Sequence, residues 1–202
     1  MTRNAVLPLV LSLILGAVAI AGCGGSSTGG STSAATGAAG STQAEVRATA
    51  TGDIPDNQVF LTYADATSGY AIRYPEGWTR QGSGATVAFV DKDNAIHVTV
   101  VAGATPTAAS AQAALARLRS SEPSLRVTAA PQIVALAHGH AVKVAYSLVG
   151  APNAVTGKRP LLLVDRYVYA HGGKIATVDL ATPKGVDNVD AYRMISRSFA
   201  WR

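Results

Sequence analysis

A tract of small, uncharged residues limits how much of this chain can fold. Residues 24–44 contain only Gly, Ser, Thr, Ala and a single Gln. Such a segment cannot bury enough apolar surface to offset the entropy lost on ordering, so we expect a flexible tether with a root-mean-square span of about 25 Å. We expect the tether to run from Cys23 to Pro55. Residues 56–202 are then left to form one globular domain.

The segment before the tether has the layout of a secretory signal peptide. Arg3 precedes residues 5–21, which carry no charge and are almost wholly aliphatic. A membrane-spanning helix needs about 20 apolar residues, whereas this stretch is shorter and contains Pro8. We therefore expect residues 1–22 to be removed as a signal peptide.

The end of this segment, Ile20-Ala21-Gly22-Cys23, resembles the lipobox of bacterial lipoproteins. The resemblance implies that the Cys23 thiol takes a diacylglyceryl group, that a dedicated peptidase cuts before Cys23, and that fatty acyl chains such as palmitate anchor the protein. Two acyl chains hold a protein stably on a membrane where one is marginal. We expect attachment at Cys23 to the extracytoplasmic face of the cell membrane. The alternative, an uncleaved anchor helix, gives the same sidedness because Arg3 would stay inside.

Charge and cysteine content exclude several classes of protein. The chain has 17 Lys and Arg against 12 Asp and Glu, a net charge of +5. This excess suits an anionic surface, but no basic run interleaved with aromatic residues indicates a nucleic-acid partner. Cys23 is the only cysteine, which excludes an intramolecular disulfide and a Cys-based metal site. An extracytoplasmic location also argues against nucleotide cofactors, and we expect no cofactor.

Residues 56–202 alternate between strand and helix patterns. Residues 107–121 carry an apolar stripe of Ala111, Ala114, Leu115 and Leu118, and Asp187-Asn188 is expected to cap a second helix with Tyr192, Ile195 and Phe199 on one face. Short β-branched and aromatic runs predict strands at residues 59–63, 70–74, 86–90, 95–102, 132–137, 141–149, 161–170 and 174–182.

The connections between these strands indicate the fold class. Turn residues separate most strands, with Asp93-Asn94 as the expected tight hairpin turn. Hairpins in place of repeated strand–helix–strand units predict an α+β fold with an antiparallel sheet and helices packed on it. No Gly-rich nucleotide-binding loop contradicts this.

The run Gly69-Tyr70-Ala71-Ile72-Arg73-Tyr74-Pro75-Glu76-Gly77-Trp78 resembles the opening strand of the PsbP-like family. A Gly139-x-Ala141 turn, a Leu-Leu-Val-Asp-Arg-Tyr strand and Ser198-Phe199 extend the resemblance over roughly residues 60–200. The family includes an extrinsic photosystem subunit, a binding protein for a small GTPase and many bacterial lipoproteins. The resemblance implies an αβα sandwich around an antiparallel sheet, with binding or assembly roles instead of catalysis.

The residues of this run suit a structural role. Pro75 ends a strand, and Gly77 permits a turn with positive φ that folds the chain back. The large ring of Trp78 then packs against the sheet. We expect core or core-edge positions for Tyr70, Ile72, Tyr74 and Trp78.

The histidines are the first candidates for chemistry. His138-Gly139-His140 places two imidazoles two residues apart, which on a strand is one face and can begin a metal site. A third ligand has to come from His97, His171 or a carboxylate. The alternative is a hairpin turn with Gly139 at its tip and two exposed histidines. We favour the hairpin and expect no metal site.

Catalytic patterns are weak. Gly82-Ser83-Gly84 lacks the Gly-x-Ser-x-Gly spacing of a nucleophile elbow. Asp91 and Asp93 flank Lys92 and are typical of hairpin polar residues, since glycosidase carboxylates come from separate elements. We expect no catalytic residues.

Two basic pairs are candidates for surface contacts. Lys158-Arg159 precedes a strand, and Arg193 with Arg197 forms an i, i+4 pair on the last helix. Both pairs suit anionic headgroups or acidic polymers, each charge contributing about 1 kcal/mol near such a surface. Ordinary solvated faces explain them equally well.

The sequence therefore predicts a surface-anchored, non-enzymatic lipoprotein. Its domain is expected to bind an envelope protein, lipid or glycan at the sheet edge or in a groove between sheet and helix. The alternatives are a divergent envelope hydrolase or metal-dependent enzyme, and a spacer without a ligand. Three convergent polar groups in a concave pocket favour the enzyme, whereas an apolar groove favours binding.

Overall fold

The computed structural model describes residues 52–153 and 155–202. The predicted signal peptide, Cys23 and the tether up to residue 51 lie outside the described residues. Helices cover Ala108–Ser121 (α2) and Val189–Ser198 (α3). The strands are Phe60–Asp65 (β1), Tyr70–Pro75 (β2), Thr79–Ser83 (β3), Thr86–Asp91 (β4), Asn94–Ala102 (β5), Arg126–Leu136 (β6), Gly139–Val149 (β7), Leu161–His171 (β8), Lys174–Pro183 (β9) and Ala200–Trp201 (β10).

The strands form two antiparallel sheets. The large sheet has seven strands in the order β3-β4-β5-β9-β8-β7-β6, and the small sheet has three in the order β1-β2-β10. Hairpins join most neighbours in the large sheet, whereas β5 reaches β9 across the helix α2 and three strands. The predicted α+β class with an antiparallel sheet is thus found in the structure.

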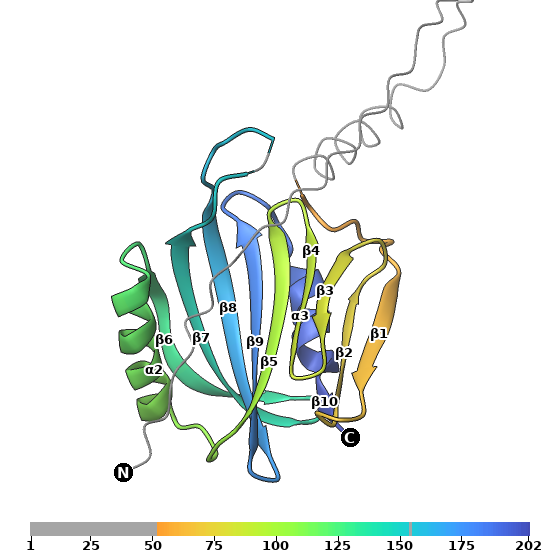
Figure 1. Cartoon of the computed structure of the whole chain (residues 1–202), viewed down its shortest axis with the longest axis vertical. Helices are drawn as coiled ribbons and strands as arrows, with labels where there is room; N and C mark the ends of the chain where they lie inside the picture. Colours follow the sequence, from red (N-terminus) through yellow and green to blue (C-terminus); the bar gives the residue numbers. More distant parts are fainter. Residues whose placement is uncertain (1–51, 154) are drawn as a thin grey trace, which may run out of the picture.

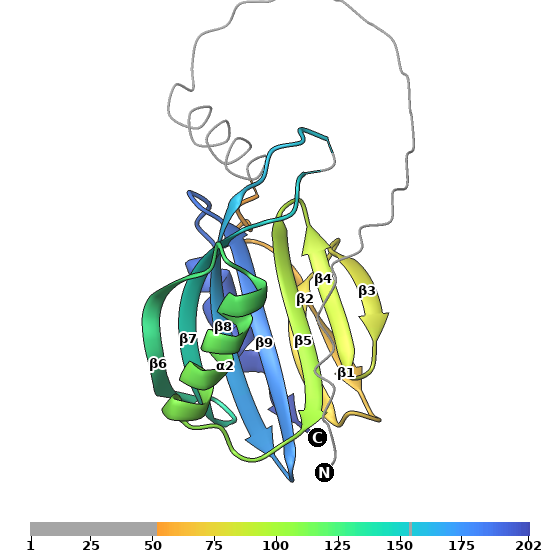
Figure 2. The ribbon, with the colours of Figure 1, turned by 60° about the vertical axis from the view of Figure 1, so that its left-hand side comes forward.

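The large sheet is covered on both faces (Figures 1 and 2). Helix α2 lies across one face, against β6 and β7. Helix α3 and the small sheet lie on the other, and α3 packs against β2. We call these the α2 face and the α3 face. The expected αβα sandwich therefore holds only roughly, because a second sheet shares one outer layer with its helix.

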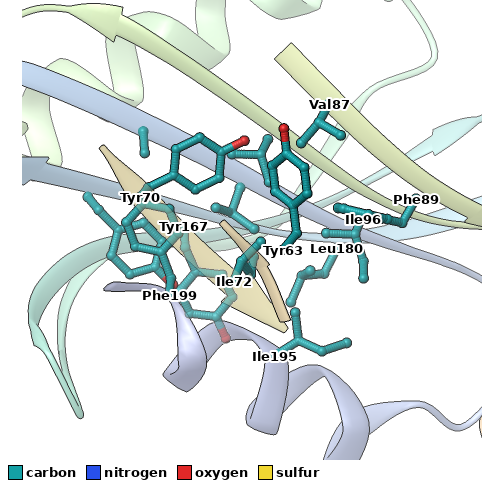
Figure 3. Packing of buried hydrophobic residues seen from close by; sticks show 14 of the residues in the cluster. Tyr63, Tyr70, Ile72, Val87, Phe89, Ile96, Tyr167, Leu180, Ile195 and Phe199 are labelled. Atoms are coloured by element: carbon teal, nitrogen blue, oxygen red, sulfur yellow. The ribbon is translucent and has the colours of Figure 1, made fainter. Parts of the chain in front are cut away.

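The main core lies between the large sheet and this mixed layer. Figure 3 shows Tyr70 and Ile72 of the small sheet in one cluster with Ile195 of α3 and Phe89 of the large sheet, all fully buried. A smaller core under α2 contains Leu115, Leu125, Val144, Tyr146, Val164 and Ala181. Of the predicted stripe on α2, Ala111 and Leu115 are buried and Leu118 is half-buried, but Ala114 is exposed.

Strand β6 begins earlier than the sequence predicts and contains Pro131. The sequence pattern predicted a strand only from residue 132. Pro lacks the N–H that a ladder uses. The pairing of β6 with β7 shifts register between Val127 and Ala129 and again between Ala129 and Gln132. Pro131 sits within this irregularity on an edge strand, the place where a sheet tolerates proline.

Two hairpin turns lie next to, not on, their predicted residues. Asp91 pairs with Asn94, so Lys92 and Asp93 form the turn, and Lys92 has a positive φ of 53°. Leu136 pairs with Gly139, so residues 137 and 138 form the turn between β6 and β7. The prediction of Asp93-Asn94 as the tight turn was therefore wrong by one residue, because Asn94 is buried and forms hydrogen bonds inside the domain.

The folded chain begins before Asp56. Ile54 packs on the main core, and its N–H donates to Oδ1 of Asn188 over 2.7 Å. The carbonyl of Gly52 accepts from the side chain of Asn94 over 2.7 Å. Asn188 directly precedes α3, but its side chain makes these inner contacts in place of a capping hydrogen bond, while Asp187 Oδ1 accepts the N–H of Val189. Residues 52–55 thus belong to the folded domain.

Among residues 52–153 and 155–202, no helix combines the length and the apolar character needed to cross a membrane.

Candidate functional site

A groove runs between α3 and the part of the α3 face that α3 leaves uncovered. Its floor comes from β7 and β8, and its wall from the first turn of α3. Successive floor residues are two apart along each strand, the spacing that places side chains on one face. The hollow has a volume of about 560 Å³, within the range of small-molecule sites. The sequence predicted binding either at the sheet edge or in a groove between sheet and helix, and located neither.

The apolar part of the groove exposes aliphatic side chains. Leu163 on the floor is 39% exposed and Val189 on the wall is 62% exposed. Ala145 adds a small apolar side chain to the floor beside Leu163. Leu163 pairs with Ser147, and the next pair on the same face is Asp165 with Ala145. Aliphatic groups gathered in a concavity indicate a contact surface more strongly than single exposed leucines do.

An ion pair forms the polar part of the floor. Nζ of Lys143 lies 2.7 Å from Oδ2 of Asp165, with both side chains about one-third exposed. The same ammonium lies 5.2 Å from the ring centre of Tyr167. Burial acts to lower the pKa of Lys143, but the hydrogen bond and charge of Asp165 outweigh it, so the pKa stands above its ordinary value. Lys143 therefore lies in the groove as a cation paired with Asp165.

Two further polar side chains at the groove, Tyr192 and Arg193, also have partners. The Tyr192 hydroxyl donates to the Ala181 carbonyl, and burial raises the pKa of Tyr192. Arg193 contacts Asp190 at 2.7 Å, one turn back on α3. These groups shape the groove and set its polarity, but none forms a nucleophile–base pair.

The histidines lie on separate parts of the domain. His97 on β5 is half-buried on the α2 face, opposite Asp179. His138 and His140 are exposed at the hairpin between β6 and β7, and His171 is exposed at the end of β8. Within residues 52–153 and 155–202, no three His, Cys, Asp or Glu side chains are grouped to hold a metal ion.

A charged pair beside His97 is structural. The Arg166 guanidinium donates two hydrogen bonds, of 2.6 and 2.7 Å, to the Asp179 carboxylate. It also lies 5.4 Å from the ring centre of Tyr146. Burial acts to lower the pKa of Arg166, and Asp179 reverses the direction. Burial lowers the pKa of His97, with the Asp179 charge opposing it. Sequence spacing does not reveal this pair, because only the register of β8 and β9 joins its members.

The weak catalytic candidates serve the fold. Tyr70 donates its hydroxyl to the Gly84 carbonyl, and the Gly84 N–H donates to the Tyr63 hydroxyl, both at 3.0 Å. The Gly82-Ser83-Gly84 turn is thus held by two core tyrosines. Asp91 lies 4.0 Å from Lys92, and Asp93 accepts a hydrogen bond from Asn153.

The basic candidates separate in the structure. Arg159 Nε donates to the Gly150 carbonyl within the loop between β7 and β8. Arg193 lines the groove, but Arg197 lines a different hollow together with Arg73 and Arg202. No sequence pattern associates Arg73 or Arg202 with a site, since no spacing links β2 to residue 202.

The comparisons with known proteins bear on the fold. No family model and no curated protein matches the sequence. Among solved structures, the cyanobacterial PsbP (CyanoP) of Synechocystis superposes with a TM-score of 0.52 at 18% identity, covering 75% of this chain and 98% of that one. The domain has a PsbP-like fold.

Two other solved structures are also similar to the PsbP-like domain. The Ran-binding protein Mog1p of Saccharomyces cerevisiae has a TM-score of 0.49 at 8% identity, over 72% of this chain and 96% of that one. A protein of Bacteroides thetaiotaomicron has a TM-score of 0.46 at 11% identity, over 70% of this chain and 48% of that one.

The run at residues 69–78 builds the scaffold of the PsbP-like domain. Tyr70 and Ile72 are fully buried, and the half-buried Tyr74 stacks on Phe89 with ring centres 4.0 Å apart. Gly77 has a φ of +88°, and Trp78 packs half-buried against the core. The predicted core roles and the positive-φ turn are confirmed. The run lies in the small sheet and its turn, whereas the groove uses β7, β8 and α3.

Proposed function

We propose that this protein is a membrane-anchored, extracytoplasmic lipoprotein whose domain is a non-enzymatic binding or assembly module of the cell envelope. The ligand, an envelope protein, lipid or glycan, sits in the groove between α3 and strands β7 and β8. The single observation that carries the binding role is the groove itself. It combines exposed Leu163 and Val189 with the Lys143–Asp165 pair.

The groove suits an amphipathic ligand. The aliphatic floor and wall lose water-exposed area when a ligand covers them, which contributes about 25 cal/mol per Å² of apolar surface. The Lys143–Asp165 pair supplies hydrogen bonds that fix orientation without requiring a free charge on the ligand. Binding sites generally have this composition, with mostly apolar walls and a few placed polar groups.

The anchor rests on the sequence of the N-terminal segment. Ile20-Ala21-Gly22-Cys23 has the lipobox order, and an uncharged apolar stretch precedes it. Acylation of Cys23 would hold the domain at a membrane, where a groove ligand from the same envelope is within reach.

The alternative is a divergent envelope hydrolase or metal-dependent enzyme. Hydrolysis by a side-chain nucleophile needs that group and a base within hydrogen-bond reach. In the groove, Lys143 is bonded to Asp165 and Arg193 to Asp190. These contacts favour a binding surface over a reaction centre.

A photo-crosslinking amino acid placed at Leu163 tests the binding role. The matched control is the same amino acid at Ile133, which is 67% exposed on β6 and does not line the groove. After irradiation of intact cells, crosslinked proteins, lipids and glycans are identified by mass spectrometry. We expect a defined product from position 163 and not from 133. Identical products at both positions, or none, contradict the groove proposal.

Cys23→Ala tests the anchor separately. We expect the variant to lose its acyl mass and to leave the membrane fraction, because the thiol that carries the acyl groups is gone. Mass spectrometry of the purified chain reads acylation directly. A wild-type chain without acyl groups contradicts the anchor, and this result leaves the crosslinking result unaffected.

A further inference from the structure

A second hollow, separate from the groove, gathers basic side chains from distant parts of the sequence. It lies on the outer face of the small sheet, between the last turn of α3 and the hairpin joining β6 and β7, and has a volume of about 540 Å³. Figure 1 shows that hairpin extending toward β10 and the C-terminus. The basic residues that line it are Arg73, Arg197, Arg202 and His138.

Backbone contacts fix three separate elements around this hollow. The Arg73 N–H on β2 donates to the Ser198 hydroxyl over 2.9 Å, which ties the strand to the end of α3, next to Arg197. Strand β10 pairs with β2, and the Arg202 N–H donates to the Gly69 carbonyl over 2.9 Å. The three arginines therefore share a hollow by construction of the fold, not through the motion of a loop.

Within the described part of the chain, the three guanidinium groups have no acidic partner within 4.0 Å. Among residues 52–153 and 155–202, ion pairs within 4.0 Å involve Lys92, Lys143, Arg166 and Arg193. Arg73, Arg197 and Arg202 are exposed and form none of these pairs. Arg197 by itself is explained by the partial negative charge at a helix C-terminus. Arg73 lies on β2 and Arg202 follows β10, so that explanation does not apply to either.

We propose that this hollow binds a phosphomonoester group. A guanidinium fork fits phosphate oxygens through paired hydrogen bonds, and a phosphomonoester carries between one and two negative charges at neutral pH. A lone carboxylate would leave more of the positive charge uncompensated. The hollow is larger than one phosphate group. The organic part of the phosphomonoester therefore lies against Met194 and the buried Ala71.

Titration calorimetry of the full chain with glycerol 3-phosphate tests the site for a soluble ligand, with sodium chloride at equal ionic strength as the blank. We expect R73Q, R197Q and R202Q each to weaken binding about tenfold, the effect of losing a charge-assisted hydrogen bond. The control is R119Q, which removes the same charge from an exposed position of α2. We expect it to change affinity less than twofold.

Vesicle co-sedimentation tests the same chemistry on a lipid. Vesicles of phosphatidic acid, a phosphomonoester lipid, are compared with vesicles of phosphatidylcholine alone. Insertion of the apolar residues 1–22 would contribute equally to both, so the difference in bound protein reports the headgroup. Binding only to glycerol 3-phosphate assigns a small soluble ligand, and binding only to phosphatidic acid assigns a headgroup. Either result supports the site if the triple variant R73Q/R197Q/R202Q loses it.

Two results overturn the proposal. One is absence of wild-type binding in both assays. The other is binding that survives in the triple variant or falls equally in R119Q. The three positions are exposed, so the triple variant is expected to keep the wild-type melting temperature, checked by circular dichroism. Crosslinking from Leu163 in the triple variant keeps this test separate from the proposed function of the groove.

Discussion

The Asn188 side-chain amide donates a hydrogen bond to Oδ1 of Asn94 over 3.0 Å, joining the start of α3 to the start of β5. Both side chains are almost fully buried. Thr182 of β9 donates to the same Oδ1, and the Gly52 carbonyl accepts from Asn94. Two asparagines thus hold together the first described residues, a helix and two strands.

Asn188→Ala is expected to lower the free energy of unfolding by about 2 kcal/mol, because the Ile54 N–H loses its buried acceptor and Asn94 loses a donor. Urea unfolding measures the change. Gln112→Ala, at an exposed position of α2, is the control and should change stability by less than about 0.5 kcal/mol. Equal effects of the two substitutions would contradict the structural role of Asn188.

Asp179→Asn is expected to destabilise the domain by about 2 kcal/mol, since it leaves the Arg166 guanidinium largely buried beside a neutral group. The expected loss is smaller than for a fully buried pair because both side chains are about one-fifth exposed. Replacing both residues, with Arg166→Met and Asp179→Leu, should recover most of the loss. Guanidinium chloride unfolding of the single and double variants decides it. A double variant less stable than the single would show that the pair itself is required.

The stability of the domain should depend on pH through His97. Burial lowers the pKa of His97 in the folded state, so the unfolded chain binds the proton more readily. The free energy of unfolding is then expected to fall as the pH drops below about 6.5, the ordinary value for histidine. His97→Gln should flatten the profile between pH 7 and pH 5. His140→Gln, at an exposed position, should retain the slope, and a slope unchanged by His97→Gln would contradict the assignment.

Two glycines with positive φ allow the cost of backbone strain to be distinguished from the cost of a steric clash. At Gly77, φ is +88° and an added Cβ meets nothing within 4 Å. Gly77→Ala should therefore cost only the backbone strain, about 1 kcal/mol. At Gly82, φ is +75° and the added Cβ lies 2.7 Å from the Thr86 carbonyl oxygen. Gly82→Ala should cost about 3 kcal/mol. Thermal unfolding ranks the two, and the reverse order would refute the contact argument.

Local sequence patterns predicted the parts of the fold that local physics determines. The buried face of α3, with Tyr192 and Ile195, follows from helical spacing, and the turn at Gly77 follows from its φ requirement. Strand β3 escaped prediction because its sequence, Thr-Arg-Gln-Gly-Ser, is wholly exposed and lacks apolar alternation. Strand β10 has two residues, too few for any periodicity.

The sites depend on contacts between distant residues, which one sequence does not encode visibly. Lys143 meets Asp165 only because Ala145 lies opposite Asp165 in the register of β7 and β8. A general expectation of a groove between sheet and helix was available from the fold class. Its residues were not, because α3 had first to be placed on β2 before the uncovered part of the sheet was known.

The irregular edge of the large sheet affects how neighbouring molecules meet. Strand β6 is an outer strand, and Pro131 with its register shifts interrupts the row of N–H and C=O groups there. Strand β3, at the opposite edge, spans only five residues. Short or interrupted edges resist joining to the edge of another molecule. Many copies packed side by side on a surface would therefore remain separate molecules and would not pair edge to edge into a continuous sheet.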